Sequence, residues 1–231
     1  MTIGRRPRGP VRGLALLVCV LAAAVCGCAS GGAKMSPQDE SGRLLRLGYV
    51  QLERGQTQQA LDSAQQAVAK DKGNAEARNF LGLIYMSQSE FDQAAEQLRE
   101  AVRINPYFTD AHNQLGVCYR ETKQYDKAVK EFQTALNDKN FKTPEKIYLN
   151  LGNLYVDQGV MSEAVRSFQR AVEVNPNYVL GYLALGSAYQ KTGKPEQAAG
   201  QFRKVMALAP DTPEAARAKQ LLESGGARSG S

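Results

Sequence analysis

The sequence predicts an all-α fold, a solenoid of five helix-turn-helix repeats followed by a C-terminal capping helix. A Leu-Gly pair recurs at spacings of 34, 34, 36 and 34 residues, as Leu47-Gly48, Leu81-Gly82, Leu115-Gly116, Leu151-Gly152 and Leu185-Gly186. Apolar and small residues keep a constant distance from each pair. A unit of this length cannot bury its apolar face alone, so stability must come from stacking on neighbouring units.

The other positions of each unit follow the same register. An alanine falls twelve residues after each glycine, at Ala60, Ala94, Ala128, Ala164 and Ala198. Four residues later come Ala64, Leu98, Phe132, Phe168 and Phe202. The glycine lets the second helix approach the first, aromatic residues fill the wedge between units, and Pro106, Pro176 and Pro210 end second helices. This pattern resembles the tetratricopeptide repeat over about three quarters of the chain.

The repeat register gives the domain boundaries. The predicted units are 41–74, 75–108, 109–144, 145–178 and 179–212. A proline and an acidic residue after Thr212 predict a capping helix over 213–223, and a small, polar tail over 224–231 is expected to be disordered. The third unit lacks its proline and carries two extra residues within 137–145, which lengthen the turn before the fourth unit. Whether this insertion has a function is left open.

The first 27 residues predict an export signal. Four arginines precede Leu14–Cys26, a run of thirteen residues without a charge, shorter than the ~20 residues that cross a bilayer. The run ends in Val25-Cys26-Gly27-Cys28, which resembles a bacterial lipobox. That resemblance implies cleavage before Cys28, a diacylglycerol and an N-acyl chain on Cys28, and, because Ala29 follows, a place in the outer membrane facing the periplasm. An ordinary signal peptide is the alternative. Residues 28–40 are expected to form a flexible tether.

Composition argues against a nucleic-acid partner. The chain carries 29 basic and 23 acidic residues, but four arginines lie before Cys28, which leaves 25 against 23. Past Cys28 only Cys118 remains, so no intramolecular disulfide is expected, and Cys118 is predicted to be a small buried residue.

No catalytic constellation is apparent in the sequence. The single histidine, His112, has no nucleophile or metal-ligand partner at a suitable spacing and is predicted to pack in the repeat interface. Each Leu-Gly glycine stands alone inside a helix, so no phosphate-binding loop is expected. We therefore expect no enzyme activity, no metal and no cofactor apart from the lipid on Cys28.

A concave groove lined by the first helix of each unit is the expected binding site. In the repeat family its lining positions correspond here to Leu45, Tyr49, Leu52, Asn79, Leu83, Met86, Asn113, Val117, Arg120, Leu149, Asn153 and Val156. The apolar content of a surface open to water predicts a protein partner, an amphipathic helix or an extended segment. The alternative for each residue is packing against a neighbouring helix.

The lipobox, the short tether and the interrupted third unit together resemble the type IV pilus pilotins, the PilF/PilW/Tgl group. That resemblance implies a small outer-membrane lipoprotein that binds secretin subunits and promotes their insertion and multimerisation. Two alternatives remain open: a repeat scaffold for peptidoglycan enzymes, and an accessory subunit of outer-membrane barrel assembly.

Overall fold

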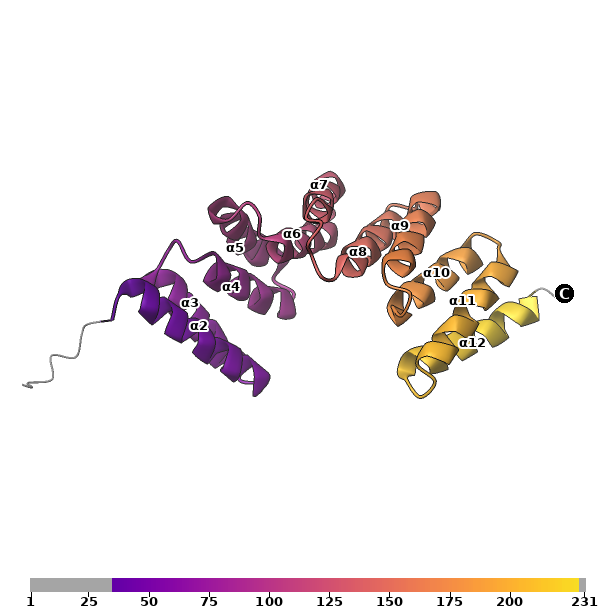
Figure 1. The fold of residues 1–231 in the computed structure, drawn as a ribbon, viewed down its shortest axis with the longest axis horizontal. Coiled ribbons are helices and arrows are strands. Elements are labelled where there is room, and N and C mark those ends of the chain that lie inside the picture. Colours follow the sequence, from indigo (N-terminus) through magenta and orange to yellow (C-terminus); the bar gives the residue numbers. More distant parts are fainter. Residues whose placement is uncertain (1–34, 229–231) are drawn as a thin grey trace, which may run out of the picture. The chain divides into compact units, whose positions relative to one another are not determined.

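The computed structural model describes residues 35–228, which form eleven helices and no strand (Figure 1). The helices are α2 (Pro37–Glu53), α3 (Thr57–Lys70), α4 (Ala75–Ser87), α5 (Phe91–Ile104), α6 (Thr109–Glu121), α7 (Tyr125–Leu136), α8 (Pro144–Asp157), α9 (Met161–Val174), α10 (Val179–Lys191), α11 (Pro195–Leu208) and α12 (Pro213–Arg228). Within Pro37–Ser231, successive helices pair as hairpins, α2 with α3 through α10 with α11, and α12 packs on α11. The predicted all-α repeat fold is confirmed.

Each hairpin closes through a short turn whose middle residue has a left-handed backbone. The φ angles are 73° at Gly55, 76° at Gly159 and 71° at Gly193. Ser89 and Lys123 take the same conformation, at 62° and 59°. A side chain with a Cβ atom is disfavoured at these φ angles, so glycine suits this turn position best.

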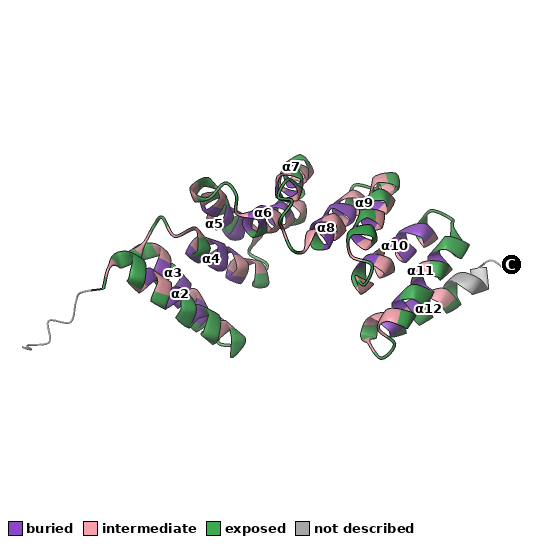
Figure 2. Ribbon diagram, viewed as in Figure 1, coloured by how far each residue is buried: buried purple, intermediate pink, exposed green. Residues whose placement is uncertain are grey.

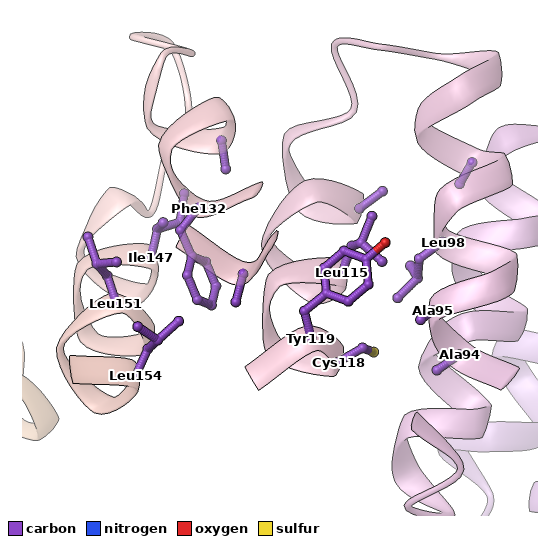
Figure 3. Close-up of a cluster of buried hydrophobic side chains, with 14 residues drawn as sticks. Ala94, Ala95, Leu98, Leu115, Cys118, Tyr119, Phe132, Ile147, Leu151 and Leu154 are labelled. Atoms are coloured by element: carbon purple, nitrogen blue, oxygen red, sulfur yellow. The ribbon is translucent and has the colours of Figure 1, made fainter. Parts of the chain in front are cut away.

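The Leu-Gly glycine marks the closest approach of the two helices in a unit. A Cβ atom at Gly116 would lie 2.6 Å from Cε1 of Phe132, and one at Gly152 would lie 2.3 Å from Cε1 of Phe168. Phe132 lies beside Ile147 in the core cluster that joins α5 to α8 (Figure 3). Glycine and phenylalanine therefore form one packing unit, which explains their fixed separation of sixteen residues.

The first unit has an open outer side. Leu47 is 41% exposed, whereas its counterparts Leu81, Leu115, Leu151 and Leu185 are all buried. Val50 is also 41% exposed, and exposed residues run along α2 in Figure 2. The difference arises because no preceding unit covers α2 within the described part of the chain.

Two helix boundaries differ from the sequence prediction. The first helix begins at Pro37, inside the predicted tether, because proline suits the first helical turn and Glu40 forms an ion pair with Lys70 at 3.0 Å. The last helix continues to Arg228, into the segment predicted to be disordered. This helix starts at Pro213, where Thr212 Oγ1 accepts a hydrogen bond from the Ala215 amide.

The insertion between the third and fourth units is tied to the body of the third. Residues 137–143 connect α7 to α8, whereas four residues connect α5 to α6 and α9 to α10. The Asp138 carboxylate accepts a hydrogen bond of 2.7 Å from Thr109 Oγ1, at the start of α6. Phe141 is half-buried against the cluster that joins α5 to α8. The longer turn is therefore held by a hydrogen bond at Asp138 and by an apolar contact at Phe141.

The predicted signal peptide and Cys28 lie outside the described residues. Within 35–228, none of the helices has the length and apolar character needed to cross a membrane.

Candidate partner-binding surface

The candidate site is the surface formed by the first helices of the units, α2, α4, α6, α8 and α10, which we call the first-helix surface. Each of these helices contacts the next one in the series. Residues at equivalent positions in successive units are therefore neighbours, although 34 to 36 residues separate them in the sequence.

Apolar side chains on this surface are half-buried and remain partly accessible. They are Leu52, Leu83, Met86, Val117, Leu149 and Val156. Tyr49 is 42% exposed, and its ring lies 4.0 Å from the Phe80 ring, between centroids, at an interplanar angle of 42°. These side chains therefore keep part of their apolar area accessible to a partner.

Two of the predicted groove residues are buried. Leu45 is 5% exposed and belongs to the core that joins the first two units, where burial of its apolar side chain is favourable. It is a packing residue, not a contact residue. Asn79 is also 5% exposed, and its Oδ1 has no hydrogen-bond partner among the described residues.

The asparagines differ in their environments. Asn113 Oδ1 accepts a hydrogen bond of 3.0 Å from Nδ2 of Asn150, which joins the third unit to the fourth. Between the second and third units, the residues at the same repeat positions are Asn79 and Gln114. The side-chain carbonyl oxygens of both are without hydrogen bonds among the described residues. Asn153 is half-buried at the equivalent of Leu83 in the fourth unit.

Arg120 is paired and does not offer a free cation. Its guanidinium contacts the Glu121 carboxylate, and Nε lies 3.4 Å from Oδ2 of Asp157, an ion-pair distance without hydrogen-bond geometry. The side chain thus bridges α6 and α8.

Two carboxylates that the sequence analysis did not single out act on this surface. Glu76 and Asp110 are exposed in the first turns of α4 and α6. Burial, and then the charges of Glu76 and Asp110, raise the pKa of Tyr49 above its usual value of 10.0. Glu76 and Asp110 are the second residues of the second and third units, a position that faces the groove in the repeat family. The repeat pattern could therefore have identified both residues.

His112 has a structural partner on each ring nitrogen. Nδ1 lies 2.6 Å from Oε2 of Glu131, and Nε2 lies 3.1 Å from the carbonyl oxygen of Pro106. Only a protonated imidazole donates at both nitrogens. The hydrogen bond to Glu131 raises the pKa of His112 above 6.5, burial opposes this shift, and the bond to Pro106 adds to it. The predicted packing role is confirmed, since His112 is 9% exposed.

This arrangement predicts a pH-dependent contribution to stability. Because the pKa of His112 is raised in the fold, its protonation favours folding below about pH 6.5, the pKa of an unfolded-chain histidine. The contribution is lost as pH rises through the folded pKa. The stability difference between the wild type and His112→Gln should therefore be larger at pH 5.5 than at pH 9. Urea unfolding at both pH values measures it, and equal differences would contradict the assignment.

Cys118 is fully buried in the cluster that joins α5 to α8. Burial raises the pKa of its thiol to about 12, so the side chain packs as a small apolar group. Among the described residues, no group of three or more His, Cys, Asp or Glu side chains could hold a metal ion.

Comparison with family models supports the repeat architecture. Models described as tetratricopeptide repeat match residues 45–107, 85–145 and 182–216, and a model described as TPR repeat matches residues 152–193. A search of curated protein sequences found no match.

Solved structures of repeat proteins share this fold. PilW, described as a widely conserved type IV pilus biogenesis factor, is 22% identical over 81% of this chain and 91% of its own, with a TM-score of 0.71. PilF of Pseudomonas aeruginosa is 20% identical over 81% of this chain and 92% of its own, with a TM-score of 0.68. MamA is 20% identical over 74% of this chain and 92% of its own, with a TM-score of 0.63. At these identities the likeness establishes the fold.

Proposed function

We propose, from the premise that this chain belongs to the tetratricopeptide-repeat family, that it is a non-catalytic lipoprotein that binds secretin subunits of the type IV pilus. In this role it would promote their localisation and multimerisation in the outer membrane. Repeat domains of this family bind protein partners, and the fold is typical of interaction scaffolds.

The observation that carries the proposal is the row of half-buried apolar side chains on the first-helix surface. Six such side chains lie on the first helices of four successive units, and Tyr49 adds an exposed aromatic ring. An apolar strip of this kind suits one face of a helix or the alternate side chains of an extended segment. Arg120, the one cation among the predicted groove residues, is paired with Glu121 and Asp157.

The proposed anchor places this surface near the membrane. Cys28 precedes Pro37 by nine residues, which reach at most roughly 30 Å when fully extended. Two or three acyl chains on Cys28 would hold the protein stably at the membrane, since a single chain binds only marginally. The partner would then meet the repeats close to where it must insert.

Several features favour a pilus secretin as the partner. The fold likeness to PilW and PilF extends over most of this chain and nearly all of theirs. The lipobox and the interrupted third unit are shared features of the pilotin group that the sequence resembles. MamA has a similar fold, so the fold by itself does not select the partner.

Deletion of the gene tests the proposal. We expect a deletion strain to lose heat-stable secretin multimers from its membrane fractions and to regain them on expression of the wild-type chain. Unchanged multimers and normal pili in the deletion strain would overturn the proposal. Crosslinking that recovers a peptidoglycan enzyme or a barrel-assembly protein would then favour one of the alternatives.

A variant of the surface tests the binding site itself. Leu83→Asp places a charge among the apolar side chains and should abolish the rescue of secretin multimers, because an apolar partner would have to desolvate a carboxylate. Val174→Asp is the matched control, since Val174 is 46% exposed on α9, a second helix. Circular dichroism must show the same helical content for both variants. A loss of helicity in Leu83→Asp would identify Leu83 as a core residue.

A further inference from the structure

We propose that the outer face of α2 rests on the phospholipid surface to which Cys28 is anchored, with anionic lipid headgroups against its arginines. This outer face consists of Arg43, Arg46, Leu47 and Val50, with Arg54 directly after the helix. The inference rests on the proposed function, since it requires the lipid anchor. It goes further by stating how the anchored chain is oriented on the membrane.

The residues of the outer face lie on one side of the helix. Arg43, Leu47 and Val50 are separated by four and three residues, the spacing that returns to the same side of an α-helix. Leu47 and Val50 are each 41% exposed, and the three arginines are exposed as well. The buried residues of α2, such as Leu44 and Gly48, lie on the opposite side.

The same repeat positions are buried in the later units. The residues equivalent to Val50 are Ile84, Cys118, Leu154 and Ala188, and all four are buried. Those equivalent to Arg43 are Ala77, Ala111, Ile147 and Gly181, which are buried too. A further unit stacked on α2 in the same way would bury the Arg43 guanidinium, which is costly without a charged partner. A further repeat, from a second copy or from another protein, therefore does not fit this face.

The other end of the repeat row provides a comparison. The exposed residues of α12 include Ala216, Arg217, Lys219, Gln220 and Glu223. Among the residues of α12 whose side chains the structure describes, no large apolar one is exposed as Leu47 is. A polar outer face is what a terminal unit needs in water. Arg43 and Arg46 meet that need, whereas exposed Leu47 and Val50 call for an apolar neighbour.

The arginines of the outer face are available to an anionic group. Arg43, Arg46 and Arg54 form no ion pair with another described residue. The acidic residues of α2 lie towards its ends, at Asp39, Glu40 and Glu53. Lys70 already pairs with Glu40. The middle of the face is therefore apolar and cationic, a combination that binds the boundary between lipid headgroups and acyl chains.

A second copy of the chain is a poorer occupant. If two α2 helices packed antiparallel around Leu47 and Val50, Arg43 of one copy would lie opposite Arg54 of the other, and the like charges would repel. Two apolar side chains per copy also fall short of the roughly 800 Å² per partner that a stable interface buries. Residues 29–34 contain no large apolar side chain that could cover the face instead.

The anchor brings this face to the membrane. Nine residues separate Cys28 from Pro37, and α2 extends for 17 residues, or roughly 25 Å. A short tether gives a high effective concentration, so a weak attraction is enough. Each basic residue near an anionic surface raises partitioning roughly 5-fold. The Tyr49 ring packs instead on Phe80 of α4, so the first-helix surface and the outer face use different sides of α2.

Fluorescence quenching in vesicles tests the inference with the lipidated mature chain purified from membranes. A fluorophore is attached to Val50→Cys or, as the control, to Ala69→Cys, which is exposed on α3 of the same unit. Cys118 is buried and does not compete for the label. In vesicles of phosphatidylcholine with about one third phosphatidylglycerol, spin-labelled lipid should quench the label at position 50 at least about 3-fold more than the label at position 69. The difference should shrink in pure phosphatidylcholine.

Two triple variants locate the charge effect. Arg43→Gln, Arg46→Gln and Arg54→Gln together should lower the quenching at position 50 towards that at position 69. Arg203→Gln, Lys204→Gln and Arg217→Gln together remove the same charge from exposed sites on α11 and α12 and should leave the quenching unchanged. Circular dichroism must show the same helical content for both variants.

Equal quenching at the two positions, or unchanged quenching in the Arg43, Arg46 and Arg54 variant, would overturn the inference. So would disulfide-linked dimers of the Val50→Cys variant, which would identify a second copy as the occupant. Failure of the proposed function is read separately. The mass of the purified chain reports the acyl chains on Cys28, and a chain without them would overturn both the anchor and this inference. The secretin-multimer assay decides the partner.

Discussion

Replacing Gly152 by alanine should lower the free energy of unfolding by about 1–3 kcal/mol. A Cβ atom at this position would lie 2.3 Å from Cε1 and 2.5 Å from Cδ1 of Phe168, closer than real side-chain atoms approach. Phe168 is 2% exposed and cannot swing into solvent without losing its own burial. Relief therefore requires α8 and α9 to separate, which opens the core of the fourth unit. Urea unfolding followed by circular dichroism measures the effect.

Gly200→Ala is the matched control for this prediction. Gly200 lies within α11, and a Cβ atom there would have no neighbour within 4 Å. Alanine is favoured over glycine inside a helix by up to ~1 kcal/mol, so this variant should be slightly more stable than the wild type. If Gly152→Ala were also neutral or stabilising, the close contact between glycine and phenylalanine would not be the constraint that fixes the repeat.

Replacing Leu115 by alanine should lower the free energy of unfolding by about 2–5 kcal/mol. Leu115 is 1% exposed within the cluster that joins α5 to α8, so truncation leaves a cavity between the second and third units. The effect should be large because each unit depends on its neighbours for burial, and a gap at a central interface weakens the contact on which both rely.

Leu47→Ala provides the same chemical change at the same repeat position. Leu47 is 41% exposed on the open side of α2, so truncation creates no enclosed cavity and should cost less than about 1 kcal/mol. The two leucines share one repeat position but differ in burial, so comparing the two variants isolates the effect of burial on the free energy of unfolding. Equal losses for Leu47→Ala and Leu115→Ala would show that neighbour stacking is not the main source of stability.

The fold was predictable because its constraints repeat. Gly82, Gly116, Gly152 and Gly186 each approach the second helix of their own unit, and a Cβ atom on any of them would lie within 2.7 Å of a side-chain atom there. Four copies of one steric constraint make the register visible in a single sequence. At Gly48 the close neighbour is instead Phe80, on α4 of the next unit. The ends were harder to predict, because the start of α2 and the length of α12 depend on local caps and packing that occur once.

The candidate surface was predictable in part. The repeat register located the half-buried apolar residues, such as Leu83 and Met86. It did not show that Leu45 is buried in the core or that Asn113 is bonded to Asn150, because those outcomes depend on side-chain contacts between units. Glu76 and Asp110 were missed because a single first-turn acid looks like an ordinary helix start, although the two residues share one repeat position.

Site-specific photocrosslinking in cells tests the central claim most directly. A photoreactive amino acid placed at Leu83 lies on the first-helix surface, and one placed at Val174 lies on a second helix as the control. We predict that light links the secretin subunit to the chain at Leu83 and not at Val174. No secretin adduct at Leu83, or recovery there of a cell-wall enzyme or a barrel-assembly protein instead, would contradict the account.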